Sequence, residues 1–190
     1  PQVVARICDE NPGLEAQIVA LPRVFNLSKR EADMAVAVSR PEAGRLTVQK
    51  IAAYRLSLAA SRDYLDRQPE IGSLAGRKGH RMIGYIPDLI FDKELDYLAE
   101  AGVETVALAS NSVSVQFNWV RAGAGIAIVH DFALPSAPGV TRILPELLNL
   151  SRSFYLIRHA DDRRVERLNR FAALLADGVG REVQRLEALA

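Results

Sequence analysis

The chain has 190 residues, enough for one large or two small domains with a full hydrophobic core. Its 24 Lys and Arg and 23 Asp and Glu leave a formal charge of +1, which excludes the strong cationic field of a nucleic-acid or anionic-membrane binder. A single cysteine and three scattered histidines exclude an internal disulfide and predict no metal site, no cofactor and a cytoplasmic setting.

The first part of the chain is predicted to alternate helices and strands at short intervals. Apolar residues at helical spacing predict a helix over 1–10, which Asn11-Pro12-Gly13 ends. The further elements expected before residue 80 are a strand over 14–19, a short helix around 24–28, a buried strand over 34–38, two strands over 46–52 and 55–60, and a loop over 61–79 with a helical piece at 64–65.

A second series of strands and helices follows, and its alternation predicts parallel sheets with right-handed crossovers. We expect strands over 82–86, 103–109 and 126–129, helices over 93–101 and 112–122, short strands over 140–144 and 154–157, and a long closing helix from Asp162. Three arginines of this last helix share a face, which is either solvated or in contact with nucleic acid: Arg163, Arg167 and Arg170.

Two glycine-rich segments resemble nucleotide-binding loops but fail the motif. The segment from Gly72 to Gly79 lacks the Gly-Lys-Ser/Thr ending of a phosphate loop. Gly123-Ala-Gly125 has Ile128 in place of the third small residue, and it follows a helix instead of preceding one. Both segments are therefore interpreted as turns.

The order of several short segments resembles the effector-binding domain of LysR-type transcriptional regulators. The resemblance runs over nearly the whole chain and rests on segments that are weak alone and specific together. These are Asn11-Pro12-Gly13, Arg30-Glu-Ala-Asp33-Met-Ala-Val36, Leu56-Ser-Leu-Ala-Ala-Ser61 with Tyr64-Leu65, Ser110-Asn-Ser112, and Trp119-Val-Arg-Ala-Gly-Ala-Gly-Ile-Ala-Ile-Val129.

This resemblance implies an α/β fold of the periplasmic-binding-protein type 2, with two Rossmann-like lobes joined by a two-strand hinge. Lobe I would comprise residues 1–53 and 155–190, and lobe II residues 54–154. The family's first strand of lobe I, its winged helix-turn-helix and its linker helix would precede Pro1, so we expect DNA to be bound only by that missing N-terminal domain.

The candidate effector site follows from the fold, because ligands of open parallel sheets bind beyond the carboxyl ends of the strands. The residues expected there are Leu21, Pro22, Val38, Tyr85, Ile86, Ser110, Asn111, His130 and Phe132. For Ser110 and Asn111, helix capping is the alternative to ligand contact. For His130 the alternative is to anchor the following loop through Asp131, and for Tyr85 and Phe132 it is packing.

The resemblance also implies a partner copy and a mode of action. Effector binding would close the hinge and shift the equilibrium from an open to a closed form, so the implied mechanism is a population shift and not catalysis. We expect a homodimer, or a tetramer of the full-length protein, formed by the first helix of one copy and the helix over 112–122 of another. The candidate interface residues are Val4, Cys8, Val113, Phe117 and Val120.

Two other classes of protein compete with a regulator of this kind. A solute-binding protein of a transport system has the same fold, and would carry a secretory leader upstream. A small α/β enzyme would need a nucleophile beside a base, or paired carboxylates, in the cleft. The close acidic pairs, Glu94 with Asp96 and Asp161 with Asp162, are interpreted as surface residues, so we expect no enzyme and no membrane contact.

Overall fold

A computed structural model describes residues 1–20, 32–41, 44–73 and 76–190, so the predicted helix around 24–28 and the candidates Leu21 and Pro22 lie outside the described residues. The chain divides into two compact units, each formed by two stretches of sequence. Unit 1 comprises Pro1–Ala53 and Ser153–Arg185, and unit 2 comprises Tyr54–Arg152 and Leu186–Ala190.

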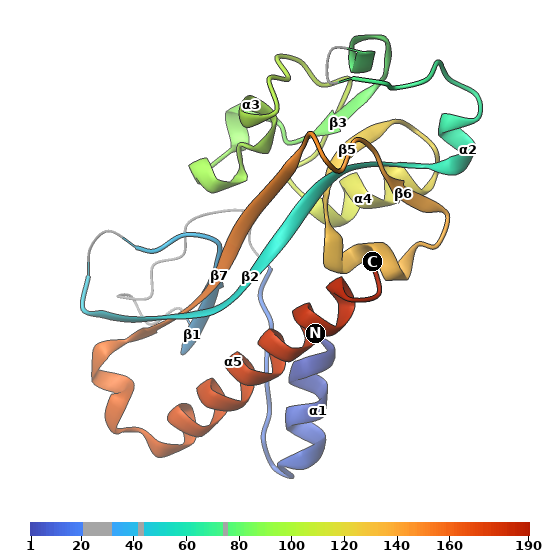
Figure 1. Cartoon of the computed structure of the whole chain (residues 1–190). Helices are drawn as coiled ribbons and strands as arrows, with labels where there is room; N and C mark the ends of the chain where they lie inside the picture. Colours follow the sequence, from blue (N-terminus) through green and yellow to red (C-terminus); the bar gives the residue numbers. More distant parts are fainter. Residues whose placement is uncertain (21–31, 42–43, 74–75) are drawn as a thin grey trace. The chain divides into compact units, whose positions relative to one another are not determined.

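Unit 1 is built from two helices and the edge of a sheet. Helix α1 (Gln2–Glu10) lies beside helix α5 (Glu166–Glu187), and strand β1 (Met34–Ala37) pairs antiparallel with β7 (Asn149–His159) (Figure 1). The two helices bury one apolar face each, because apolar residues recur there at helical spacing. Their shared core contains Val3, Ile7, Leu156, Ala172, Leu175 and Ala176.

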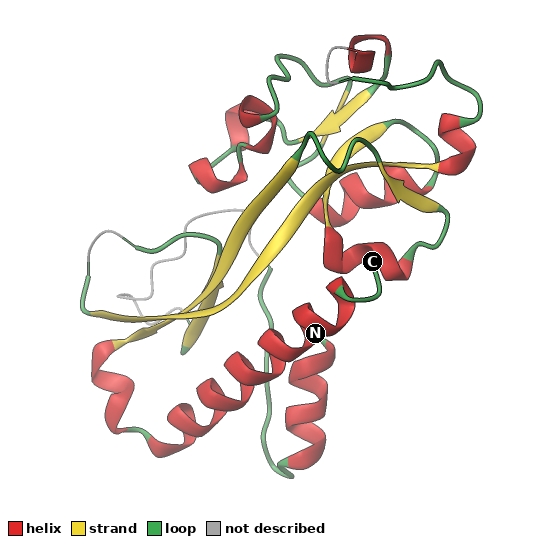
Figure 2. Cartoon of the chain, viewed as in Figure 1, coloured by secondary structure: helices red, strands yellow, loops and turns green. Residues whose placement is uncertain are grey.

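Unit 2 is a mixed sheet with short helices around it (Figure 2). Strand β2 (Leu46–Ser61), which begins in unit 1, pairs antiparallel with β5 and with β6. The other elements are α2 (Arg62–Leu65), β3 (Met82–Gly84), α3 (Tyr97–Glu100), β4 (Leu108–Ala109), α4 (Val113–Arg121), β5 (Ile126–His130) and β6 (Val140–Arg142), with 3-10 turns at Gly76–Gly79, Pro87–Leu89, Lys93–Leu95 and Asp131–Ser136.

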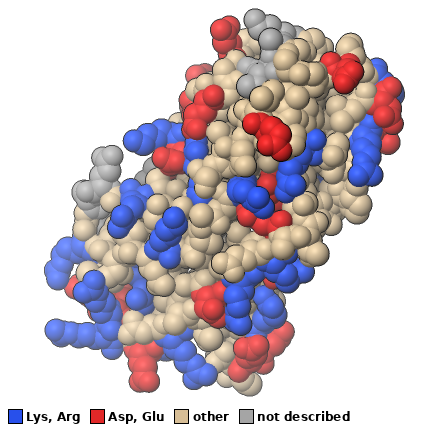
Figure 3. Space-filling model, viewed as in Figure 1, with Lys and Arg blue, Asp and Glu red and all other residues tan. Residues whose placement is uncertain are grey.

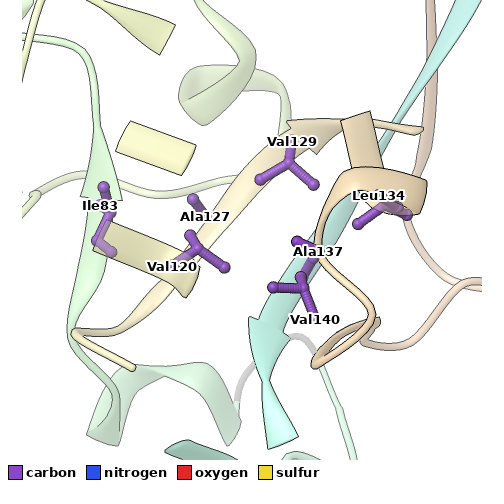
Figure 4. Packing of buried hydrophobic residues seen from close by; sticks show 8 residues of the cluster. Ile83, Val120, Ala127, Val129, Leu134, Ala137 and Val140 are labelled. Carbon is purple, nitrogen blue, oxygen red and sulfur yellow. The ribbon is translucent and has the colours of Figure 1, made fainter. Parts of the chain in front are cut away.

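The core of unit 2 lies where α4 packs on the strands. Val120 of α4 is completely buried, and Ile83 and Ala127 meet it from β3 and β5 (Figure 4). Leu134 and Val140 close the same cluster from the following turn and strand. This packing fixes the carboxyl end of β5, the strand that ends at His130.

The predicted parallel pairing is correct for only part of the sheet. Strand β3 pairs parallel with β4 and with β5, as the alternation of strands and helices predicts. The pairs of β2 with β5 and β6, and of β1 with β7, are antiparallel. Strands β2 and β7 are long connections between the two units, which an argument from crossover helices alone does not anticipate.

The strand predicted over 14–19 does not form. These residues are irregular, and Ile18 and Val19 are 61% and 66% exposed. No described strand pairs with this segment, and an apolar pattern without a partner backbone cannot complete a ladder of hydrogen bonds. The next strand, predicted over 34–38, does form as β1, but the prediction that it is buried is wrong, since Val36 of this edge strand is 50% exposed.

The helix predicted over 93–101 is broken into two short pieces at Asp96. Asp92 accepts a hydrogen bond from the backbone N–H of Glu94 at 2.9 Å, and Asp96 accepts one from the N–H of Ala99 at 3.3 Å. Each aspartate therefore starts its own turn, which is the competition between side chain and backbone that disfavours aspartate within a helix.

Other elements are present with changed limits. Positions 46–52 and 55–60 form one continuous strand, the strand predicted over 154–157 extends over Asn149–His159, and the closing helix begins at Glu166, after a 3-10 turn at Ala160–Arg164. The strands predicted over 82–86, 103–109 and 140–144 shorten to Met82–Gly84, Leu108–Ala109 and Val140–Arg142.

The two glycines of Gly123-Ala-Gly125 serve the turn between α4 and β5. Gly123 has a φ of 69°, which favours glycine, and a Cβ at Gly125 would overlap the carbonyl oxygen of Arg81. The requirement for glycine is therefore explained by the backbone, as the failed dinucleotide motif predicts.

Candidate functional site

His130 and Phe132 lie together at the carboxyl end of β5 in unit 2. Their ring centroids are 5.0 Å apart, and both rings contact Tyr54 of β2, at 5.2 Å from His130 and 5.7 Å from Phe132. Tyr97 of α3 meets the imidazole edge to face, at 6.4 Å and 88°. We call Tyr54, Tyr97, His130 and Phe132 the aromatic cluster.

Two members of the aromatic cluster are buried and two are more accessible. Tyr54 and Tyr97 are only 1% and 4% exposed, whereas His130 and Phe132 are half-buried. Edge-to-face and tilted contacts of this kind hold rings in fixed orientations. The two tyrosines therefore support a surface on which His130 and Phe132 are presented.

Burial makes this surface electrically neutral. It lowers the pKa of His130 to about 4, against a smaller opposing effect of the neighbouring Asp131 carboxylate, so the imidazole is uncharged at neutral pH. Burial also raises the pKa of the Tyr54 and Tyr97 phenols, so both stay protonated at neutral pH. The cluster can exchange hydrogen bonds with a ligand, but it carries no charge.

The cation that contacts the Tyr97 ring of the cluster is already neutralised. The guanidinium of Arg152 lies over the Tyr97 ring, 5.6 Å from its centroid. It pairs with Glu94, with 2.9 Å between Nε and Oε2, and with Glu100. Arg152 therefore fixes the position of Tyr97, and it is not an open anchor for a carboxylate.

A buried carboxylate follows the cluster in sequence. The Asp131 side chain is 3% exposed, and its Oδ2 lies 3.0 Å from Nη2 of Arg142 and 3.9 Å from Nε of Arg55. This network anchors the turn that carries Phe132. The alternative role considered for His130 was to anchor this loop through Asp131. In the structure the anchoring contacts are made by the Asp131 carboxylate with Arg142 and Arg55.

Ser110 and Asn111 precede helix α4 in unit 2. Oγ of Ser110 accepts the backbone N–H of Ser112 at 3.1 Å, and its carbonyl oxygen accepts Nε2 of the buried Gln116 at 2.7 Å. Asn111 is exposed, and the Ser112 side chain makes no capping hydrogen bond. Ser110 is therefore used in the helix entry, while Asn111 is available to solvent.

The other candidates are spread over both units. Tyr85 is buried and contacts Tyr97 at 6.1 Å, Ile86 is half-buried, and Val38 of unit 1 is half-buried directly after β1. His130 and Phe132 are among the residues predicted from the sequence, whereas Tyr54 and Tyr97 are not. Tyr54 lies between the two strands predicted over 46–52 and 55–60. It was therefore not assigned to a strand, and its buried position on β2 was not predicted.

The candidate interface residues have unequal exposure. Val120 is completely buried in the core of unit 2, so its prediction as an interface residue is wrong: at helical spacing it faces its own sheet. Phe117 packs partly on the same core, and Val113 is 38% exposed. Val4 and Cys8 on α1 are half-buried.

Three members of the two acidic pairs have partners of their own, and the predicted surface position is wrong for the fourth, Asp162, which is 8% exposed. Glu94 pairs with Arg152 and Asp96 caps α3, while Asp161 pairs with Arg45 at 3.0 Å. Within the described residues no group of three His, Cys, Asp or Glu could hold a metal ion. A search of the helices in the same residues finds none with the length and apolarity of a membrane span. Basic side chains lie beside acidic ones on the face shown in Figure 3.

Comparison with known proteins gives a consistent picture. The profile of the LysR substrate binding domain family matches residues 1–180. The regulatory domain of CrgA, a LysR-type regulator from Neisseria meningitidis, has 20% identity and a TM-score of 0.82, covering 94% of this chain and 91% of that one.

Two further regulatory domains have a similar fold. That of AphB from Vibrio vulnificus has 18% identity and a TM-score of 0.68, with 91% of this chain and 88% of that one covered. That of MetR from N. meningitidis, a LysR family regulator, has 17% identity and a TM-score of 0.66, with coverages of 93% and 85%. No curated protein sequence matches the chain.

Proposed function

Because the chain belongs to the LysR substrate-binding domain family, we propose that it senses a small-molecule effector and passes the binding event to a DNA-binding domain of the same protein. The observation that carries the proposal is the family match over residues 1–180. The same match gives no support to the transport alternative. We place this activity in the cytoplasm, where the half-buried Cys8 would stay reduced.

The effector is proposed to contact His130 and Phe132. Both side chains are half-buried on a rigid aromatic support, and the neutral imidazole offers a hydrogen bond without a charge. An aromatic or other flat, uncharged part of the effector fits this surface best. The other residues kept as candidate contacts are Val38, Tyr85, Ile86, Ser110 and Asn111, with Leu21 and Pro22.

The mechanism is proposed to be a shift between conformations. The two units would be the regulatory lobes, and an effector that binds one arrangement of the lobes better than another changes their equilibrium by that difference in affinity. The attached DNA-binding domains would then change their position on a promoter. In this mechanism no bond of the effector is broken.

A thermal-shift screen of small organic acids and aromatic compounds tests this proposal. At least one compound should raise the melting temperature, and His130→Ala should weaken its binding about tenfold, the loss of one good contact. Phe91→Ala is the matched control, since Phe91 is an exposed aromatic residue of unit 2 outside the cluster. Equal weakening by both substitutions would remove His130 from the site.

We also propose a homodimer that uses α1 of one copy and the start of α4 of the other. Val113 and Val115 are 38% and 40% exposed on α4, and Val4 and Cys8 are half-buried on α1. Light scattering should report about twice the 20.9 kDa chain mass. Val113→Glu should yield monomers, while Leu89→Glu, at another exposed apolar residue of unit 2, should leave the dimer intact. A monomeric parent chain would contradict the proposal.

A further inference from the structure

Unit 1 contains a groove that the effector proposal does not use. It has a volume of about 350 Å³ and opens between the end of α1 and the first turns of α5. Cavities of this size hold small organic molecules. The groove is lined by Ile7, Asn11, Leu14, Glu166, Arg167, Arg170, Phe171 and Leu174.

The floor of the groove is apolar. Ile7 is 5% exposed, and Leu14, Phe171 and Leu174 are half-buried around it. All four side chains border the core that joins α1 to α5. A hydrocarbon or aryl group placed here would lose contact with water without displacing any polar partner.

The rim of the groove is cationic. Arg167 and Arg170 are exposed, and no carboxylate of the described residues pairs with either guanidinium. Glu166, also exposed, is the acidic residue of the lining, so two cations face one anion. The three residues occupy the first turns of the 22-residue helix α5, where the helix dipole adds further positive potential.

Hydrogen bonds hold both walls in place. Nδ2 of Asn11 donates to the carbonyl oxygen of Ile7 at 2.8 Å and closes the end of α1. Nη1 of Arg158 donates to Oδ1 of Asn169 at 2.8 Å, and Nδ2 of Asn169 donates to the carbonyl oxygen of Arg163 at 2.7 Å, which fixes the start of α5. A ligand would therefore find the groove already formed, which lowers the entropic cost of binding.

We propose that this groove is a second ligand site, specific for a small amphipathic carboxylate. The apolar part of the ligand lies on Ile7, Phe171 and Leu174, and its carboxylate accepts charge-assisted hydrogen bonds from Arg167 and Arg170. A cation of the same length would meet the two guanidinium groups and be repelled. Two of the three arginines predicted to share a face of the last helix, Arg167 and Arg170, thus bind a ligand distinct from the effector at His130.

Octanoate and octylammonium, which share one alkyl chain and differ in charge, are the probes. Isothermal titration of the chain should show saturable 1:1 binding of octanoate and at least about tenfold weaker binding of octylammonium. Arg167→Gln with Arg170→Gln should weaken octanoate binding about tenfold or more. Because both arginines are exposed, this double variant should remain folded.

Two further variants locate the bound probe. Arg163→Gln, at an exposed arginine outside the groove, and His130→Ala, in unit 2, should leave the affinity for octanoate unchanged. Leu14→Trp should reduce it by filling the groove. Octanoate binding that is absent from the parent chain, that survives the double substitution, or that octylammonium equals would overturn the proposal.

Discussion

The backbone N–H of Arg55 donates to Oε1 of Glu187 at 2.6 Å, and Nε of Arg55 lies 3.2 Å from Oε2 of the same carboxylate. Arg55 is on β2, while Glu187 is the last residue of α5, a helix whose other turns belong to unit 1. Glu187 itself belongs to unit 2, so this carboxylate holds the last turn of α5 to β2 within that unit.

Glu187→Ala should lower the free energy of unfolding by about 1 kcal/mol, because it removes a charge-assisted hydrogen bond at a partly exposed position. Urea unfolding measures this loss, and hydrogen exchange at the Arg55 amide should become faster. Glu182→Ala is the control: its carboxylate is similarly exposed and also pairs with arginine, but its partners are Arg6 and Arg185. Exchange at Arg55 that responds equally to both variants would contradict the assignment.

Arg142→Ala should be more damaging than Glu187→Ala. Among the described residues it leaves the buried Asp131 carboxylate with only the more distant Arg55, and breaking a buried ion pair costs several kcal/mol. We expect a loss of about 2–3 kcal/mol in the same urea experiment. Asp131→Asn combined with Arg142→Ala should restore part of it, because no uncompensated charge stays buried. A double variant as unstable as the sum of the two single variants would contradict this explanation.

The stability of the domain should fall between pH 7 and pH 5 because of His130. Its pKa is about 4 in the folded chain, below the unfolded value of about 6.5, so only the unfolded chain gains a proton in this range. Stability from this residue is full above the unfolded pKa and is lost as the pH falls toward the folded one. The parent chain should lose about 2 kcal/mol more than His130→Gln between these pH values. Equal losses would place the imidazole in water.

Helix packing in unit 1 should depend on Gly178. A Cβ at this position would lie 2.5 Å from Cγ1 of Val3, so α1 and α5 approach closely there. Gly178→Ala improves helix propensity by about 1 kcal/mol, yet we expect a net loss of about 1–2 kcal/mol from overpacking. Val3→Ala in the same chain should recover most of it, as measured by urea unfolding. A stabilised single variant would show that the helices are not in this contact.

The elements that the sequence predicts well are those whose pattern and packing agree. Helix α1, strand β5 and helix α4 follow directly from apolar spacing and turn residues. The segment 14–19 fails because a strand requires a partner that no local pattern supplies. The helix over 93–101 fails because Asp96 caps a new turn instead of continuing the old one.

The candidate site was predictable only in part. His130 and Phe132 follow a buried strand, which is a local signal. Their support by Tyr54 and Tyr97 depends on contacts between residues 33 or more positions apart, as does the pairing of Arg152 with Glu94. The buried face of Val120 shows the same limit, since helical spacing predicts a shared face but does not show which partner covers it.

The most direct test of the account is the ¹⁵N spectrum of the histidine side chains, recorded with and without a compound that raises the melting temperature. His130 lies in the aromatic cluster, whereas His159 lies at the end of β7 beside Asp161. The compound should shift the imidazole resonances of His130, in a neutral form at pH 7, and leave those of His159 unchanged. A compound that binds the chain without moving the His130 resonances would contradict the proposed effector site.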